Sequence, residues 1–159
     1  MNGGAWVMEK YIIKFLAVNS RGVIARLSAL IARKGFNIES FCAGHHIKDG
    51  ESSIVITFSG SEGDVQQAVA QMSKLINIIS AEYYHEKDVV QRELLLVKLK
   101  NVSGVKEKAQ ALGGRLMKEY SGFVDFEFVD KPNSIEKNVA ELKKNFTVID
   151  ISRSGNNAI

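Results

Sequence analysis

The sequence predicts an α+β protein made of two ferredoxin-like βαββαβ units in tandem. Two observations lead to this prediction. Apolar segments with strand and helix periodicity follow one another in the order strand, helix, strand, strand, helix, strand, and that order occurs twice in 159 residues. The length suits two small units that depend on each other for stability. We place the units at residues 10–85 and 90–155, with the charged link Glu86-Lys87-Asp88 between them.

The first unit opens with an apolar strand over residues 11–18, which leads into a helix. Asn19 or Ser20 is expected to cap that helix, and Gly35 to end it. Its apolar positions recur at helical spacing and form one face: Val23, Leu27, Leu30 and Ile31.

A hairpin completes the middle of the first unit, with strands over 37–47 and 52–58 and a turn at Lys48-Asp49-Gly50-Glu51. Ser61 is expected to cap the second helix. The residues expected to point inward from this helix are Val65, Ala68, Val69 and Met72. A strand over 76–84 closes the unit.

The second unit repeats the order, starting with a nearly continuous apolar strand over 93–99 and a helix over about 103–112. Strands over 115–120 and 123–129 form a hairpin. In the second of these, Val124, Phe126 and Phe128 alternate with acidic residues, so one face of the sheet is expected to be buried and the other to meet water. Asn133 or Ser134 is expected to cap a helix over 135–144, and a strand over 146–152 follows.

Composition and charge exclude several classes of function. The apolar fraction is 45%, yet no apolar run reaches the about 20 residues of a membrane span. The single cysteine, Cys42, cannot form an intramolecular disulfide and fits a reducing compartment. The net charge of +3 is small and dispersed, which argues against a nucleic-acid partner. We therefore expect a cytoplasmic protein with neither a membrane nor a nucleic-acid partner.

The junction between the first strand and the first helix is the best candidate for a functional site. It reads Asn19-Ser20-Arg21-Gly22-Val23-Ile24-Ala25-Arg26. A helix N-terminus offers free backbone N–H groups and the positive end of a dipole, which together bind a carboxylate. Asn19 and Asn37 flank the helix, and their amide oxygens can accept from an ammonium group. The combination predicts a site for a free amino acid.

Each of these residues also has a structural interpretation. Asn19 can serve as a helix cap, and the two roles are compatible. Asn37 can be a polar start to a strand. Gly22 is harder to explain structurally, because glycine in a first helical turn costs up to about 1 kcal/mol relative to alanine. Close approach of a ligand to the backbone would account for it.

Other chemistries find little support in the sequence. His45 and His46 are adjacent on a predicted strand and point to opposite faces, so they cannot share a metal ion. Cys42 has no neighbouring group that would activate it. The stretch from Lys34 to Phe41 partly matches an RNA-binding signature, but Glu39 would repel phosphate. No catalytic constellation is evident, which favours a binding or regulatory module.

Four segments together resemble a known family. They are Asn19-x-x-Gly22-Val23-Ile24-x-Arg26, Arg33-x-Gly35-Phe36-Asn37-Ile38-Glu39-Ser40, Gln91-Arg92-Glu93-Leu94-Leu95-Leu96-Val97-Lys98 and Ile149-Asp150-Ile151-Ser152-Arg153-Ser154-Gly155. Their order and spacing resemble the small, regulatory subunit of acetolactate synthase (acetohydroxyacid synthase), whose N-terminal part is an ACT domain. The resemblance covers roughly residues 11–155.

The resemblance implies a non-catalytic role. The small subunit binds and activates a large catalytic subunit, which carries thiamine diphosphate, Mg²⁺ and FAD; this chain is expected to hold no cofactor or metal. It also confers feedback inhibition by valine or another branched-chain amino acid.

The resemblance further implies that the effector lies between the ACT domains of a homodimer. By motif position, Asn19, Gly22 and the amides of Val23 and Ile24 hold the carboxylate end. Asn37 and Ile38, from the other chain, complete the site. The alternative is a free-standing ACT-type amino-acid sensor without a synthase partner, against which the Arg92-Glu93 motif and the second unit count.

Overall fold

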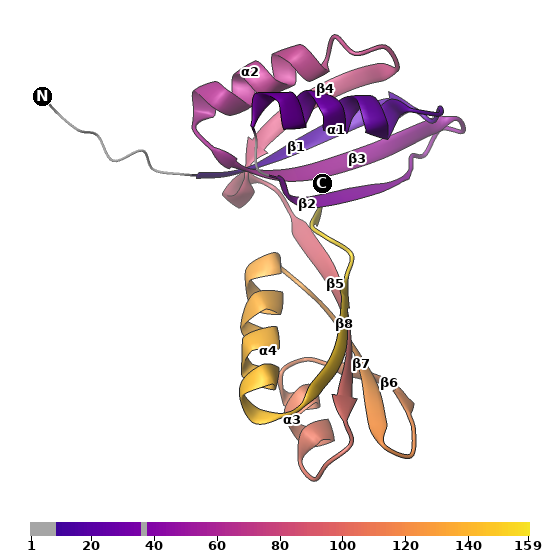
Figure 1. The fold of residues 1–159 in the computed structure, drawn as a ribbon, viewed down its shortest axis with the longest axis vertical. Helices are drawn as coiled ribbons and strands as arrows, with labels where there is room; N and C mark the ends of the chain where they lie inside the picture. Colours follow the sequence, from indigo (N-terminus) through magenta and orange to yellow (C-terminus); the bar gives the residue numbers. More distant parts are fainter. Residues whose placement is uncertain (1–8, 36–37) are drawn as a thin grey trace, which may run out of the picture. The chain divides into compact units, whose positions relative to one another are not determined.

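The computed structural model describes residues 9–35 and 38–159, which form two compact units (Figure 1). Unit 1 runs to Val90 and also includes Ala158 and Ile159, whereas unit 2 comprises residues 91–157. In each unit an antiparallel sheet carries two helices on one face. The predicted fold class, two βαββαβ units in tandem, is therefore confirmed.

Unit 1 has its four strands in the order β2-β3-β1-β4. Its elements are β1 (Glu9–Val18), α1 (Val23–Lys34), β2 (Ile38–His45), β3 (Glu51–Gly60), α2 (Glu62–Met72), β4 (Ile78–His85) and the 3₁₀ helix η1 (Glu86–Asp88). Strand β1 lies between β3 and β4, and the two edges of this sheet are β2 and β4.

The core of unit 1 lies between the sheet and its helices. Alternate residues of β1 face the helices, because side chains on a strand point to opposite faces in turn. The buried side chains of this core include Tyr11, Ile13, Phe15, Leu27, Ile31, Ile54, Ile56, Val65 and Met72. The apolar faces expected for both helices are thus confirmed, with Leu30 and Val69 only partly buried.

The opposite face of the unit 1 sheet has a smaller apolar cluster. Ile12 and Val55 are buried there by Ala158, with Val89 and Cys42 packed alongside. Backbone hydrogen bonds in both directions between Val90 and Ile159 hold the end of the chain in place. Cys42, the single cysteine, is half-buried at this cluster.

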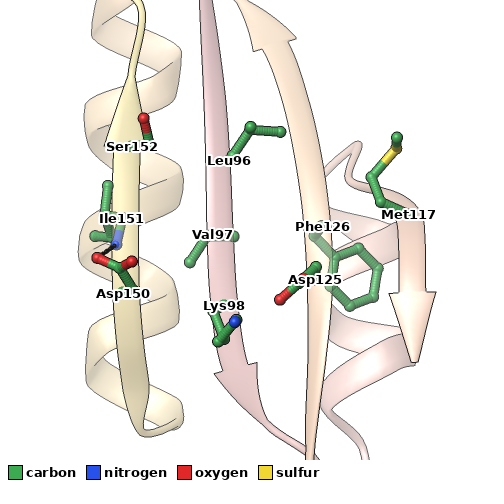
Figure 2. Close-up of a pocket in the computed structure, with 9 residues that line it drawn as sticks. All are labelled: Leu96, Val97, Lys98, Met117, Asp125, Phe126, Asp150, Ile151 and Ser152. Carbon is green, nitrogen blue, oxygen red and sulfur yellow. Dashed lines mark hydrogen bonds between the residues drawn. The ribbon is translucent and has the colours of Figure 1, made fainter. Parts of the chain in front are cut away.

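Unit 2 repeats the topology, with strand order β6-β7-β5-β8 and a short strand β9 (Asn157–Ala158) paired to β5. Its other elements are β5 (Gln91–Lys100), α3 (Val105–Ala111), β6 (Arg115–Glu119), β7 (Phe123–Asp130), α4 (Pro132–Asn145) and β8 (Val148–Arg153). Val124, Phe126 and Phe128 are buried against α3 and α4, as their alternation predicted. Leu96, Lys98 and Asp125 belong to the other face (Figure 2).

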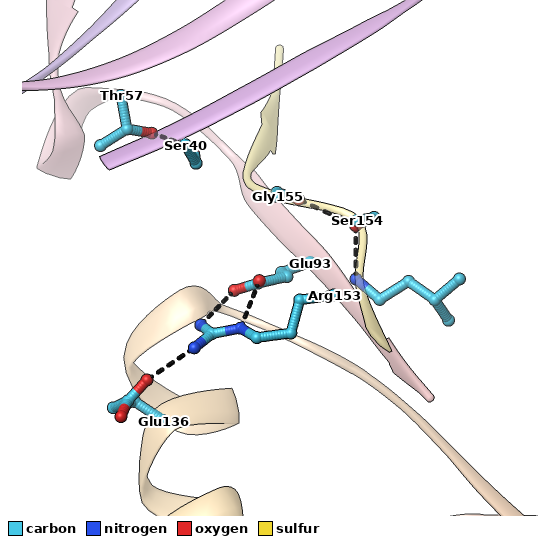
Figure 3. A network of polar contacts seen from close by, with 8 residues as sticks. Ser40, Thr57, Glu93, Glu136, Arg153, Ser154 and Gly155 are labelled. Atoms are coloured by element: carbon cyan, nitrogen blue, oxygen red, sulfur yellow. Dashed lines mark hydrogen bonds and ion pairs between the residues drawn. The ribbon is translucent and has the colours of Figure 1, made fainter. Parts of the chain in front are cut away.

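An ion-pair clamp joins the start of β5 to the end of β8 in unit 2 (Figure 3). Nε and Nη2 of Arg153 donate to the two carboxylate oxygens of Glu93, at 2.7 and 2.9 Å, and Nη1 donates to Glu136 at 2.7 Å. The hydrogen bond to Glu93 raises the pKa of Arg153; partial burial acts in the opposite direction, and Glu136 raises it further. Ser154 adds a hydrogen bond from the backbone N–H of Leu94. Two motifs that carry the family resemblance thus meet in a structural clamp.

The helix starts differ from the predictions at two of the three expected caps. Ser61 does cap α2, in a reciprocal capping box with Asp64. Helix α1, however, has Gly22 as its N-cap and no side-chain cap, so the expected capping by Asn19 or Ser20 is wrong. Helix α4 starts at Pro132 instead of after Asn133 or Ser134, because proline is well suited to the first helical position.

Within residues 9–35 and 38–159, no helix is long and apolar enough to cross a membrane.

Candidate functional site

The loop before α1 is held in place by backbone contacts from two other loops of unit 1. The N–H of Asn19 donates to the carbonyl of Gly50 in the β2–β3 turn, at 2.7 Å. The N–H of Val18 donates to the carbonyl of Asn77, and the side chain of Asn77 donates to Ser20 Oγ at 3.0 Å. Asn77 has φ 78°, a left-handed conformation that asparagine tolerates better than most residues. The loop is therefore positioned by residues remote in sequence.

The start of α1 is open to an anion. Gly22 adopts the left-handed conformation, with φ 82°, and the first intrahelical bond runs from Arg26 N–H to its carbonyl at 3.0 Å. The amides of Ile24 and Ala25 lie in the first turn, where N–H groups have no intrahelical acceptor. No acidic residue occupies this turn and no side chain caps it. The positive end of the dipole is consequently not neutralised from within α1.

Arg26 adds a full positive charge to this end of the helix. A Cβ atom on Gly22 would lie 3.5 Å from Nη1 of Arg26, so the guanidinium extends back over the glycine. Side chains on a helix tilt toward its N-terminus, which explains this orientation. Arg26 forms no ion pair with any residue in the described part of the chain. The arrangement provides a guanidinium and free amides for a carboxylate.

The predicted site residues fall into two groups. Asn19, Gly22, Val23 and Ile24 lie together at the start of α1. The side chain of Val23 is buried in the core and its backbone N–H donates to the carbonyl of Ser20 at 3.5 Å, whereas Ile24 is 50% exposed. Asn37 lies outside the residues that the structure describes.

Ile38 lies at the other end of the sheet. Val18 pairs with Glu51 of β3, but Ile38 pairs with Phe58, seven positions further along that strand. At about 3.3 Å per residue, the separation is roughly 23 Å. Ile38 also packs partly buried against the core of its own unit. A single copy of unit 1 therefore does not bring Ile38 to the start of α1.

Two contributors to the site were not anticipated from the sequence. The role of Arg26 could have been predicted from the sequence, because the side chain of an arginine one turn after a helix-starting glycine is directed back over that glycine. The role of Asn77 was harder to predict, because the only sequence feature that indicates it is an asparagine between two apolar residues after a helix. Among the described residues, no group of histidine, cysteine, aspartate and glutamate side chains has the arrangement of a metal site.

Known proteins similar to this chain include members of one family. Residues 13–80 match the family model described as the AHAS small subunit-like ACT domain. The chain is 33% identical over 100 residues to the acetolactate synthase small subunit of Mycobacterium avium, covering 63% of this chain and 60% of that protein. It is 29% identical over 157 residues to the Bacillus subtilis small subunit, covering 94% and 89% of the two chains.

The fold of the whole chain also has a solved counterpart. The acetolactate synthase small subunit from Thermotoga maritima superposes with a TM-score of 0.87 at 23% identity, covering 94% of this chain and 96% of that one. The likeness extends over both units. The family resemblance in the sequence is thereby confirmed: residues 13–80 match an ACT domain of the AHAS small-subunit type, and nearly all of the chain is similar to acetolactate synthase small subunits.

Proposed function

We propose that this chain is a regulatory subunit of acetolactate synthase, which activates a thiamine-diphosphate-dependent catalytic subunit and makes it sensitive to a branched-chain amino acid. The observation that carries the proposal is the uncapped start of α1 with Arg26 over Gly22, inside the region that matches the AHAS small subunit-like ACT domain. The Mycobacterium avium and Bacillus subtilis relatives bear small-subunit names, which support the assignment of a partner.

The start of α1 suits the carboxylate of such an effector. The carboxylate would accept from the first-turn amides and from the guanidinium of Arg26, and charge-assisted bonds of this kind contribute about 1.5–3 kcal/mol each. The side chain of Asn19 is exposed, and its amide oxygen would accept from the ammonium group. Ile24 offers an exposed apolar surface for a branched side chain. Valine, leucine and isoleucine all meet these requirements.

A homodimer would complete the site. Strand β2 is an edge of the unit 1 sheet, and an unpaired edge favours association with another strand. Two copies of β2 paired antiparallel about a twofold axis would form one eight-stranded sheet. The partner subunit's Ile38 would then approach the sheet end where β2 finishes and α1 begins. The roughly 23 Å separation within one chain would be bridged by this pairing.

The chain is not expected to catalyse acetolactate formation itself. Small-subunit relatives are consistent with a non-catalytic role. Thiamine diphosphate, Mg²⁺ and FAD would all be carried by the catalytic subunit, and this chain would supply contacts and effector sensitivity. A cytoplasmic location would place it with that partner.

The alternative, a free-standing amino-acid sensor, makes a different prediction about partners. Sedimentation velocity of the chain mixed with its cognate catalytic subunit distinguishes the two. A regulatory subunit forms a complex that sediments faster than either component, at micromolar concentrations. A free-standing sensor binds valine but leaves both sedimentation profiles unchanged.

A further inference from the structure

The turn that leads from α2 into β4 contains a left-handed residue with a side chain. Among residues 9–35 and 38–159, Asn77 is the one residue other than glycine with a positive φ, at 78°. It is the third residue of a turn closed by a hydrogen bond from the N–H of Ile78 to the carbonyl of Leu75, at 3.1 Å. A turn whose third residue is left-handed favours glycine or asparagine there. Glycine adopts this conformation with less strain, so the turn alone does not explain the amide side chain.

Both the backbone and the side chain of Asn77 contact the loop before α1. Its carbonyl accepts from the N–H of Val18 at 2.8 Å, and its Nδ2 donates to Ser20 Oγ at 3.0 Å. The residues joined by the second bond are 57 positions apart in the sequence. The first bond does not depend on the side chain of residue 77, whereas the second does. A substitution can therefore remove one attachment and keep the other.

Ser20 is the first residue of the turn that starts α1. Its carbonyl accepts from the N–H of Val23 at 3.5 Å, and its own N–H donates to the carbonyl of Val18 at 2.8 Å. Gly22, within this turn, is left-handed. The free N–H groups at the start of α1 follow directly along the chain, so the turn sets their direction. Within the described residues, no side chain caps α1 and holds these groups instead.

The bond between Asn77 and Ser20 lies on the side of the sheet away from the proposed dimer contact. In the order β2-β3-β1-β4, the loop after β1 lies between β3 and β4. The turn at Gly50 joins β2 to β3 and supports this loop from one side, whereas Asn77 precedes β4 and supports it from the other. Loss of the bond is therefore not expected to change the mass of a dimer formed through β2.

This bond is also a weak contributor to folding. Ser20 is exposed and Asn77 is half-buried, so water competes for both groups. Its effect is local, because it restricts a loop that presents hydrogen-bond donors. A loop that is already ordered binds a ligand more tightly than one that becomes ordered on binding.

We propose that Asn77 is a positioning residue for the effector site. Through Ser20, it holds the start of α1 in the conformation that accepts the carboxylate of a branched-chain amino acid. Asn77 itself need not contact the effector. This inference rests on the proposed function, because it names a residue that sets the affinity of the proposed site.

Calorimetric titration of the full chain with valine tests this role. Asn77→Gly keeps the left-handed backbone and removes the amide, and Ser20→Ala removes the other partner of the same bond. Each is expected to weaken valine binding about three- to tenfold, the range that one hydrogen bond covers. Ser20→Thr keeps the hydroxyl and should bind valine as the native chain does. Ser73→Ala is the matched control, because its exposed hydroxyl donates to the carbonyl of Ala70 and not to Ser20.

The double variant Asn77→Gly/Ser20→Ala shows whether the two residues act through one bond. If they do, it binds valine no more weakly than the weaker single variant. If the two losses multiply instead, Asn77 does not act through Ser20, and the inference is overturned. Light scattering should give the same mass for every variant as for the native chain. A lower mass in the weakened variants would assign the effect to dimerisation and would also overturn it. Urea unfolding establishes that each variant is folded.

The failure of this inference differs from the failure of the proposed function. If the native chain binds none of valine, leucine and isoleucine, the proposed effector sensitivity is wrong and this inference falls with it. If the native chain binds valine and both single variants bind it equally well, the effector site stands and Asn77 is not its positioning residue.

Discussion

At the scale of single residues, Gly22 and Arg26 shape the exposed start of α1, where we propose that the effector binds. The left-handed conformation of Gly22 ends the preceding loop without a side chain over the first-turn amides. The guanidinium of Arg26 lies near Gly22 and adds a full positive charge to the partial charges of those amides. The side chain of Arg26 forms no ion pair in the described part of the chain, so it can be altered to test ligand binding. A substitution at Gly22 strains its left-handed backbone and therefore needs a matched control.

We expect Gly22→Asp to weaken valine binding at least tenfold, equivalent to about 1.4 kcal/mol. The new carboxylate would lie beside Arg26 and the helix N-terminus and would occupy the place of the effector's carboxylate. Gly22→Asn is the matched control, because it imposes the same left-handed strain without the charge. Calorimetric titration with valine compares the two. Equal affinities for the Asp and Asn variants would exclude carboxylate binding at this position.

The raised pKa of the buried Tyr11 predicts that the protein loses stability at alkaline pH. Burial, followed by the hydrogen bond and the charge of Glu9, raises the pKa of Tyr11 to about 12, from an ordinary value near 10. The stabilisation is complete below pH 10 and is lost as the pH rises toward 12, by up to about 2–3 kcal/mol. Urea unfolding between pH 8 and pH 12 should show this loss.

Tyr11→Phe should reduce that alkaline loss, whereas Tyr120→Phe in unit 2 should retain it. An unchanged pH dependence in Tyr11→Phe would mean that another group is responsible.

At the scale of the elements, hydrophobic periodicity predicted the helices and strands well, and the cap positions less well. Side-chain alternation along a strand or helix depends only on local geometry, so Phe126 and Leu27 could be assigned to cores directly. Capping failed where a stronger local constraint was present: the turn at Gly22 in α1 and the ring of Pro132 in α4. Ser61 succeeded because Asp64 completes its capping box.

The candidate site was predicted only in part, because some of its residues are far apart in the sequence and are placed only by folding. Asn19 through Ile24 are contiguous, so their proximity follows from the chain itself. The support that Asn77 gives to Ser20 depends on how two loops meet after folding. The separation of Ile38 from Gly22 depends on strand register, which the sequence does not specify without the pairing pattern.

The clamp between β5 and β8 gives a prediction for stability. Glu93→Gln replaces an acceptor oxygen by a donor facing the buried side of Arg153, and should lower the free energy of unfolding by about 1.5–3 kcal/mol. Glu136→Gln alters the exposed partner of the same guanidinium and should cost about 0–1 kcal/mol. Urea unfolding of both variants measures the difference. Equal effects would show that the burial of Glu93 does not matter.

At the scale of the whole molecule, the β2 edge of the unit 1 sheet and the distance between Ile38 and the start of α1 both favour the proposed homodimer. Light scattering of the chain at micromolar concentration should give about twice the monomer mass of 17.6 kDa. Ala43→Pro, in the middle of β2, should shift the mass toward that of the monomer, because proline removes a backbone donor at the edge. A native chain that is strictly monomeric would contradict the proposed pairing.

The most direct test of the central claim is the rate of acetolactate formation from pyruvate when the chain is titrated into a fixed amount of its cognate catalytic subunit, with and without valine. We expect the chain alone to form no acetolactate, the catalytic subunit alone to be slow and insensitive to valine, and the mixture to reach a higher, saturable rate that valine lowers. A mixture no faster than the catalytic subunit alone, with valine having no effect, would contradict the account.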